Sequence, residues 1–336
     1  MSANDGNPNR RELIGAIAAT TLATSLPAAD SPQETRSGDM VHRQFGKTGI
    51  KVSAIGLGGS HIGNPADENE GIRIVRTAID RGITFMDNCW DYHNGKSEVV
   101  MGKALRDGYR EKVFLMTKFD GRTKAATAHQ IDESLKRLQT DHIDLMQYHE
   151  NIRLEDPDRF FSDGPLEALQ EAKQAGKIRF IGFTGHKDPV VHLRMLDLAA
   201  QHHFHFDSAQ MPINVLDANF RSFTKEVVPR LISQGIALLG MKPLAEGEIP
   251  RSGLITAIEA LHYAMSQPTT VVITGCDTME RLEQALEAAR TFKPMTKAQM
   301  AALTDKTREA ALTGRLEKFK TTNVFDGTAQ NPQWMG

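Results

Sequence analysis

Four polar side chains with matched acid and base chemistry lie at or just after the ends of short apolar runs in the sequence. Asp87, Lys118 and His149 each end such a run, and Tyr92 comes five residues after Asp87. A tyrosine phenol has an ordinary pKa of about 10, and a neighbouring ammonium lowers that pKa by favouring the phenolate. We therefore expect Lys118 to bring Tyr92 closer to a working proton donor at neutral pH.

The other two side chains can support the same step. Asp87 can pair with Lys118 and hold it in place, and a neutral His149 can donate a second hydrogen bond to a substrate carbonyl oxygen. Nothing in this set requires a metal. The two cysteines, Cys89 and Cys276, have no metal-ligand spacing, so the sequence indicates free thiols and no metal site.

These residues need a scaffold that brings several strand ends together. After Ile50, apolar runs alternate with amphipathic segments of helical length, which is typical of βαβ units and a parallel sheet. The eight candidate strands are Val52–Leu57, Thr84–Asp87, Val113–Lys118, Asp144–His149, Phe180–Thr184, Phe206–Met211, Ala237–Lys242 and Thr270–Thr274. Eight such units favour an α/β fold of the (β/α)8 TIM-barrel type over a doubly wound sheet of about six strands.

In such a barrel the carboxyl ends of the strands meet at one mouth, so the four polar residues are expected to converge there. Lys47-Thr48-Gly49 predicts a β-hairpin ahead of the barrel. The pattern predicts an extra C-terminal helix at Thr296–Leu312, with Thr296 as N-cap. It also predicts an irregular tail at Thr321–Gly336.

Several motifs resemble those of the aldo-keto reductase family and occur in the family order. The family's catalytic Asp, Tyr, Lys and His match residues in FMDNCWDYHNGKSE, FLMTKF and DLMQYHE. Further matches are RQFGKTGIKVSAIGLGG, IRFIGFTGH, SAQMPIN, GMKPL and ITGCDTMERLEQAL. The resemblance implies an NADP(H)-dependent enzyme that reduces an aldehyde or ketone, with Asp87, Tyr92, Lys118 and His149 as catalytic residues and Tyr92 as general acid.

The resemblance also implies a cofactor groove. Met241 stands where the family has an aromatic that stacks on the nicotinamide, and a thioether packs there less rigidly. Arg281 matches the arginine that binds the adenosine 2′-phosphate, whereas the nearby carboxylate of Asp277 keeps NAD(H) open. The residues implied to bind cofactor are Thr184, His186, Gln210, Met241, Lys242, Leu244, Gly275, Arg281 and Gln284, and the substrate candidates are Trp90 and Phe325.

The N-terminus resembles a twin-arginine export signal. Arg10-Arg11 stands just before the uncharged run Leu13 to Leu26, which is shorter than the roughly 20 residues that span a bilayer. We therefore expect residues 1–40 to be a signal and disordered linker, residues 41–336 the barrel domain, and the location periplasmic without stable membrane insertion. A disordered extension on a cytoplasmic protein is the alternative.

The composition favours a small-molecule partner. The net charge is -2, with 40 Lys and Arg residues that form no basic tract, so there is no electrostatic reason to expect nucleic acid. Two rival functions keep the barrel: a Schiff-base lyase that uses Lys118, and a non-catalytic subunit that senses a bound cofactor. The particular carbonyl, the direction of the reaction and the oligomeric state stay open.

Overall fold

A closed barrel of eight parallel strands forms the centre of the protein. The computed structural model describes residues 1, 34–65 and 67–336. The strand order around the barrel runs from β4 to β11 and back to β4. The strands are β4 (Ile55–Gly58), β5 (Phe85–Asp87), β6 (Phe114–Phe119), β7 (Ile143–Tyr148), β8 (Ile178–Thr184), β9 (Ser208–Pro212), β10 (Ala237–Met241) and β11 (Val271–Gly275). The predicted (β/α)8 barrel is confirmed.

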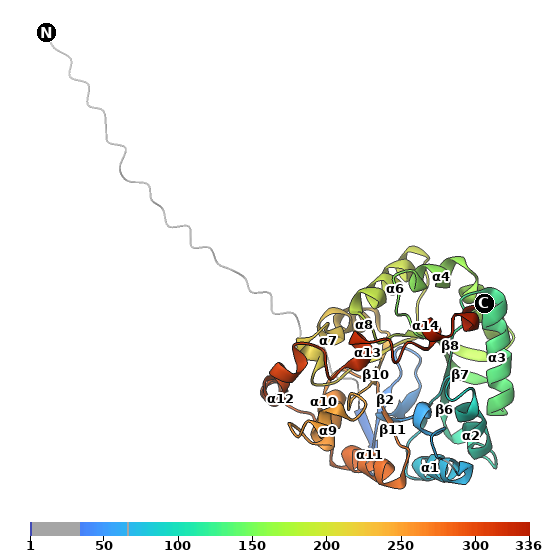
Figure 1. The fold of residues 1–336 in the computed structure, drawn as a ribbon, viewed down its shortest axis with the longest axis horizontal. Coiled ribbons are helices and arrows are strands. Elements are labelled where there is room, and N and C mark those ends of the chain that lie inside the picture. Colours follow the sequence, from blue (N-terminus) through green and yellow to red (C-terminus); the bar gives the residue numbers. More distant parts are fainter. Residues whose placement is uncertain (2–33, 66) are drawn as a thin grey trace. The chain divides into compact units, whose positions relative to one another are not determined.

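Helices surround the strands (Figure 1). They include α1 (Glu68–Asp80), α2 (Lys96–Ala104), α3 (Lys124–Leu138), α5 (Pro165–Gln174), α6 (Pro189–Gln201), α10 (Ala257–Ser266) and α11 (Met279–Thr291). The apolar spacing of residues 225–233 predicts one helix, but the segment is divided between α7 (Phe223–Glu226) and α8 (Val228–Gln234), because Pro229 falls in the first turn of α8. The short helices α4 (Asp156–Ser162) and α9 (Glu248–Arg251) were not predicted.

The run expected as the first barrel strand serves two sheets. Residues Lys51–Ser53 form β3, which pairs with β2 (Met40–Gln44) in an antiparallel sheet, and the chain enters the barrel only at Ile55. Ala54 marks the crossing, since its N–H donates to the carbonyl of Val41 at 2.7 Å. The apolar run is continuous because both sheets bury it, so hydrophobicity alone could not show the change of partner.

The polar stretch expected as linker contributes a strand. β1 (Glu34–Ser37) pairs with β2, and the Glu34 carboxylate forms an ion pair with the buried guanidinium of Arg43 at 2.5 Å. The linker prediction is therefore wrong for residues 34–40, because backbone pairing and an ion pair hold them without an apolar pattern. Residues 2–33, which carry the predicted export motif, lie outside the described residues.

Three apolar clusters form the core of the described residues. One fills the barrel interior around Phe45, Phe85 and Phe114, and a larger one lies between the strands and the surrounding helices. The third includes Tyr263 of α10 and Phe319 of the C-terminal segment. Within the described part of the chain, no helix is both long and apolar enough to cross a membrane.

The C-terminal segment crosses the face of the barrel (Figure 1). The predicted extra helix is α12 (Lys297–Ala311), which begins after Thr296 with a capping box. The expected irregular tail contains α13 (Lys318–Thr321), α14 (Gly327–Gln330) and a final 3-10 turn, η4 (Pro332–Met335). Polar contacts hold it: the Glu150 carboxylate accepts the N–H groups of Gly327 and Thr328, each at 2.7 Å.

Candidate active site

The structure brings Asp87, Lys118 and Tyr92 into direct contact. Asp87 ends β5, Lys118 lies near the end of β6, and Tyr92 lies in the loop before α2. The Lys118 ammonium donates to Asp87 Oδ1 at 2.5 Å, to the carbonyl of Asn88 at 2.7 Å and to the Tyr92 hydroxyl at 3.0 Å. Because Lys118 is 1% exposed, these three acceptors use all the hydrogens of its ammonium.

His149 completes this group directly after β7. Its ring packs edge-on against Tyr92, with the ring centroids 6.0 Å apart. The four residues that the sequence singled out therefore lie at one end of the barrel, around one phenol group.

The pKa of Tyr92 differs from the expectation. Burial of the phenol raises this pKa well above its ordinary value, and the negative charge of Asp87 adds to the effect. The expected lowering by Lys118 is not found, chiefly because burial opposes the phenolate and because Asp87 lies beside Lys118. The consequence is that Tyr92 stays a neutral phenol with a proton to donate.

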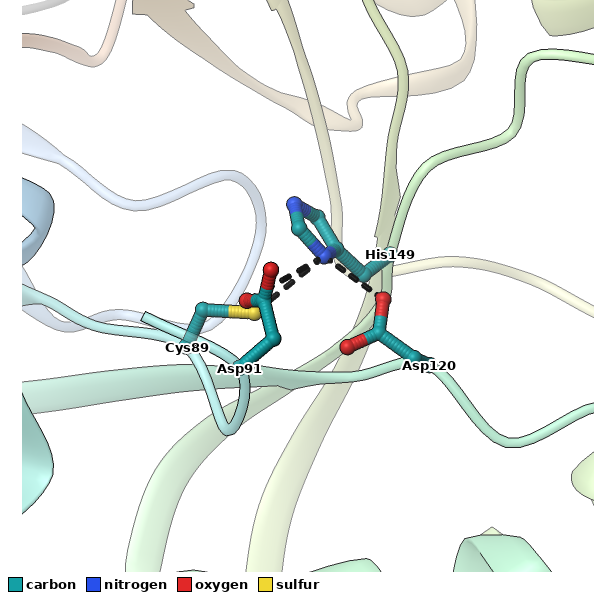
Figure 2. A group of neighbouring side chains, drawn as sticks. All are labelled: Cys89, Asp91, Asp120 and His149. Carbon is teal, nitrogen blue, oxygen red and sulfur yellow. Dashed lines mark hydrogen bonds and ion pairs between the residues drawn. The ribbon is translucent and has the colours of Figure 1, made fainter. Parts of the chain in front are cut away.

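A second set of polar side chains lies next to His149 (Figure 2). The sequence did not indicate this set. His149 Nδ1 lies 2.9 Å from Asp120 Oδ1, 3.2 Å from Cys89 Sγ and 3.8 Å from Asp91 Oδ1. Asp120 directly follows β6, one position after the last residue of the strand. A second polar residue after the same apolar run, close behind Lys118, is the sequence signal that could have indicated it.

The carboxylates change the proton affinity of the histidine. Burial of the imidazole opposes its charged form, but the charge and hydrogen bond of Asp120 outweigh burial, so the pKa of His149 is raised. Burial and the charge of Asp120 also raise the pKa of Asp91 to about 7. The expected neutral His149 therefore lies in surroundings that favour its cation.

A cavity of about 460 Å³ opens beside the tetrad and is lined by both Asp87 and Tyr92. Of the residues implied to bind cofactor, six line it: Gln210, Met241, Lys242, Leu244, Gly275 and Arg281. Gly275 is needed there, because a Cβ at this position would lie 2.1 Å from His61 Nδ1. The cavity runs from the phenol of Tyr92 toward the N-terminal end of α11.

Charges of both signs line the far part of this cavity. Arg281 is exposed and forms no ion pair with another described residue. Lys242, which the resemblance implies binds cofactor, pairs with Glu246. Asp277 also lines the cavity, as the sequence had suggested.

Three of the implied cofactor residues do not line the cavity. Thr184 is buried, and its carbonyl accepts the side-chain amide of Asn151 at 2.8 Å. His186 Nε2 lies 3.1 Å from Asp326 Oδ1 in the C-terminal segment. Gln284 is half-buried on α11.

The two substrate candidates contact the C-terminal segment or belong to it. Trp90 donates to Glu133 at 2.7 Å and packs edge-on against Trp334. Phe325 lies under the Lys242 ammonium, which is 4.7 Å from the centre of its ring. Both therefore lie where this segment meets the barrel.

The chain belongs to the aldo/keto reductase family, since the profile of that family matches residues 54–259. It is 32% identical over 231 residues to L-galactose dehydrogenase of Arabidopsis thaliana, covering 63% of this chain and 67% of that protein. It is 38% identical over 161 residues to aldo-keto reductase YhdN of Bacillus subtilis, covering 43% of this chain and 47% of that protein.

A solved structure agrees with this membership. The holo form of an aldo-keto reductase from Bacillus halodurans superposes with a TM-score of 0.67 at 25% sequence identity. The match covers 79% of this chain and 95% of that chain. The chain is thus an oxidoreductase of the aldo-keto reductase type on a (β/α)8 barrel.

Proposed function

We propose that this protein reduces an aldehyde or ketone to an alcohol with NADP(H), using Tyr92 as the general acid. One observation carries the proposal: a neutral phenol, hydrogen-bonded to a buried lysine, lines a cavity together with six residues implied to bind cofactor. Family membership supports the reaction class.

A reduced nicotinamide, when bound, supplies the hydride that adds to the carbonyl carbon. Tyr92 gives its proton to the carbonyl oxygen, so the product is an alcohol. The Lys118 ammonium, 3.0 Å from the phenol oxygen, stabilises the phenolate that remains. His149 donates a second hydrogen bond to the same oxygen and orients the carbonyl.

The cavity suits a nicotinamide carboxamide. Gln210 lines it, and its Nε2 donates to Asp87 Oδ2 at 3.3 Å. Gln210 Oε1 is buried without a partner among the described residues. A buried acceptor without a donor is costly, and the NH2 group of a carboxamide can supply that donor.

Arg281 supports NADP(H) over NAD(H). An exposed guanidinium without an internal partner can bind a phosphate at two points. Asp277 opposes this preference, while the charge of Glu246 is offset by Lys242. The cofactor preference therefore depends on Arg281.

The Schiff-base alternative has little support from the geometry. A nucleophilic lysine must be a neutral amine, but the Lys118 ammonium donates to three acceptors and one of them is a carboxylate. Borohydride with a ketone, in the absence of nicotinamide, should therefore leave Lys118 unmodified.

The test of the proposal is oxidation of NADPH followed by absorbance with a panel of sugar, aliphatic and steroid-like carbonyls. We expect multiple turnovers with at least one class. A bound NADPH that no carbonyl oxidises within minutes would support the sensor alternative instead.

We also propose that the protein is exported through the twin-arginine pathway. The Arg10-Arg11 pair and the uncharged run after it support this proposal. A route for folded proteins would let the barrel take up its cofactor before export.

A further inference from the structure

The proposed reaction leaves three side chains beside His149 without a role. Cys89, Asp91 and Asp120 place one ligand atom each within 4.8 Å of one another and of the histidine (Figure 2). Cys89 and Asp120 are fully buried, and Asp91 keeps 13% of its side chain exposed. Two carboxylates that are shielded from water need a positively charged partner.

The geometry selects Asp120 as the main partner of the histidine. Figure 2 shows one ring nitrogen of His149 directed at the cluster and the other directed away from it. The directed atom, Nδ1, carries at most one proton, and its nearest acceptor is Asp120 Oδ1 at 2.9 Å. Both residues are held by their backbones: His149 N–H donates to Phe119 at 2.9 Å, and Asp120 N–H donates to Gln130 at 2.8 Å.

The spacing fits a shared proton better than a metal ion. Ligand atoms around a tetrahedral zinc lie about 3.4 Å apart, given bonds of roughly 2.1 Å. The Nδ1 to Oδ1 separation of 2.9 Å is shorter than this and equals an ordinary charge-assisted hydrogen bond.

We infer that Asp120 is a positioning residue, which fixes His149 with a proton on Nδ1 and keeps the imidazole cationic, so that Nε2–H is a charged donor to the carbonyl oxygen. The role of Nε2–H as donor to the carbonyl oxygen rests on the proposed function. A charged donor stabilises the oxygen more strongly as negative charge develops on it than a neutral imidazole does. Carboxylate partners of this kind commonly set the tautomer of a functional histidine.

The charges around the cluster agree with this role. Cys89, Asp91 and Tyr92 face it from the loop after β5, with Asp87 and Lys118 beyond them, while Glu150 and Arg122 lie at its edge. Arg122 donates to the backbone carbonyls of His149 and Glu150 and pairs with Asp156, so it stabilises the segment rather than the ring.

The sign of the pH effect follows. Burial opposes the charged ring, but Asp120 outweighs it, so the pKa of His149 is raised and the cation persists to higher pH. The donor is then lost as pH rises through that pKa. Removing the carboxylate should move this loss to lower pH.

The first measurement needs no variant of Asp120. Nitrogen-15 NMR of the full chain without cofactor, with the His149 signals assigned from a His149→Gln spectrum, reports which ring nitrogen keeps its proton at high pH. We expect Nδ1. A neutral ring protonated on Nε2 would overturn the inference.

The second measurement compares two buried carboxylates. Asp120→Asn should lower the pKa of His149 by about one unit or more. Asp144→Asn is the matched control, because Asp144 is also buried but pairs with Arg110 and Arg179 at the other end of β7. An unchanged His149 titration in Asp120→Asn would contradict the inference.

Kinetics then separate positioning from general damage. Asp120→Asn should lower kcat about tenfold or more at neutral pH and leave NADPH affinity unchanged. In a His149→Gln background the same change should cost almost nothing further, because the two residues act as one unit. If the losses of kcat in the two single variants add fully in the double variant, the inference is contradicted. It is also contradicted if the purified native protein holds one equivalent of zinc and the Asp120→Asn variant holds none.

The two proposals can fail separately. If no carbonyl is reduced but Asp120 still sets the protonation of His149, only the proposed function is wrong. If turnover is normal in Asp120→Asn and the titration does not move, only the inference about Asp120 is wrong.

Discussion

At the scale of single residues, the type and chain position of four polar side chains predicted that they lie together. Asp87, Tyr92, Lys118 and His149 were found in this way, and the structure places them together. The pKa shifts of Tyr92 and His149 could not be predicted, because burial and the balance of neighbouring charges depend on side chains from different strands. Trp90 was named for its type, but its partner Trp334 lies far away in the sequence.

Arg281 carries the predicted cofactor preference. Arg281→Ala should weaken NADPH binding by roughly 1.5–3 kcal/mol and leave NADH nearly unchanged, because only NADPH has the 2′-phosphate. Equilibrium fluorescence titration with each nucleotide measures this. Equal weakening of NADPH binding and NADH binding would show that Arg281 acts through packing and does not bind the 2′-phosphate.

Asp91 gives a pH-dependent stability. Its pKa rises from 3.8 to about 7 on folding, so between these values the folded state binds more protons than the unfolded state. The contribution of Asp91 to stability is therefore present at low pH and decreases as pH rises through about 7. Asp91→Asn should gain stability relative to the native protein over this range, by a few kcal/mol at most, since one pKa unit is about 1.4 kcal/mol. Urea unfolding of both proteins at pH 5 and pH 8 measures this gain. A difference in unfolding free energy that is the same at both pH values would contradict the prediction.

At the scale of elements, periodicity predicted the long helices and the eight strands well. It failed where one pattern serves two partners, as between β3 and β4, and where polar contacts hold the chain, as in β1. The turns of the C-terminal segment were also missed, because carboxylates such as Glu150 and Asp326 hold them rather than an apolar stripe.

The N-cap of α11 links helix stability to the cofactor groove. Thr278 Oγ1 accepts the N–H of Arg281 at 3.2 Å. Thr278→Ala should therefore cost about 1 kcal/mol of stability and also weaken NADPH binding. Thr296→Ala is the control, because it removes the equivalent cap of α12 away from the cavity. An equal loss of NADPH affinity in both variants would show that the effect is not local.

At the scale of the whole molecule, the barrel agrees with the comparisons over most of its length. The fold alone does not select a carbonyl, because the candidate substrate contacts come from loops and the C-terminal segment.

The export proposal has a direct test in cells. Replacing Arg10 and Arg11 together with Lys should keep a full-length precursor in the cytoplasm, while the native protein appears outside the inner membrane in a shorter form. Cell fractionation and mass spectrometry of both versions measure this. If both versions stay uncleaved in the cytoplasm, the N-terminus is an extension and not an export signal.

The central claim is that Tyr92 donates the proton, and single-turnover oxidation of bound NADPH by an accepted carbonyl tests it most directly. Tyr92→Phe removes the hydroxyl and keeps the ring, so NADPH binding should persist while the rate falls about a hundredfold or more. Tyr109→Phe, which changes a half-buried tyrosine that donates to Asp80 and does not line the cavity, should keep the native rate. A rate within a few-fold of native in Tyr92→Phe would contradict the account.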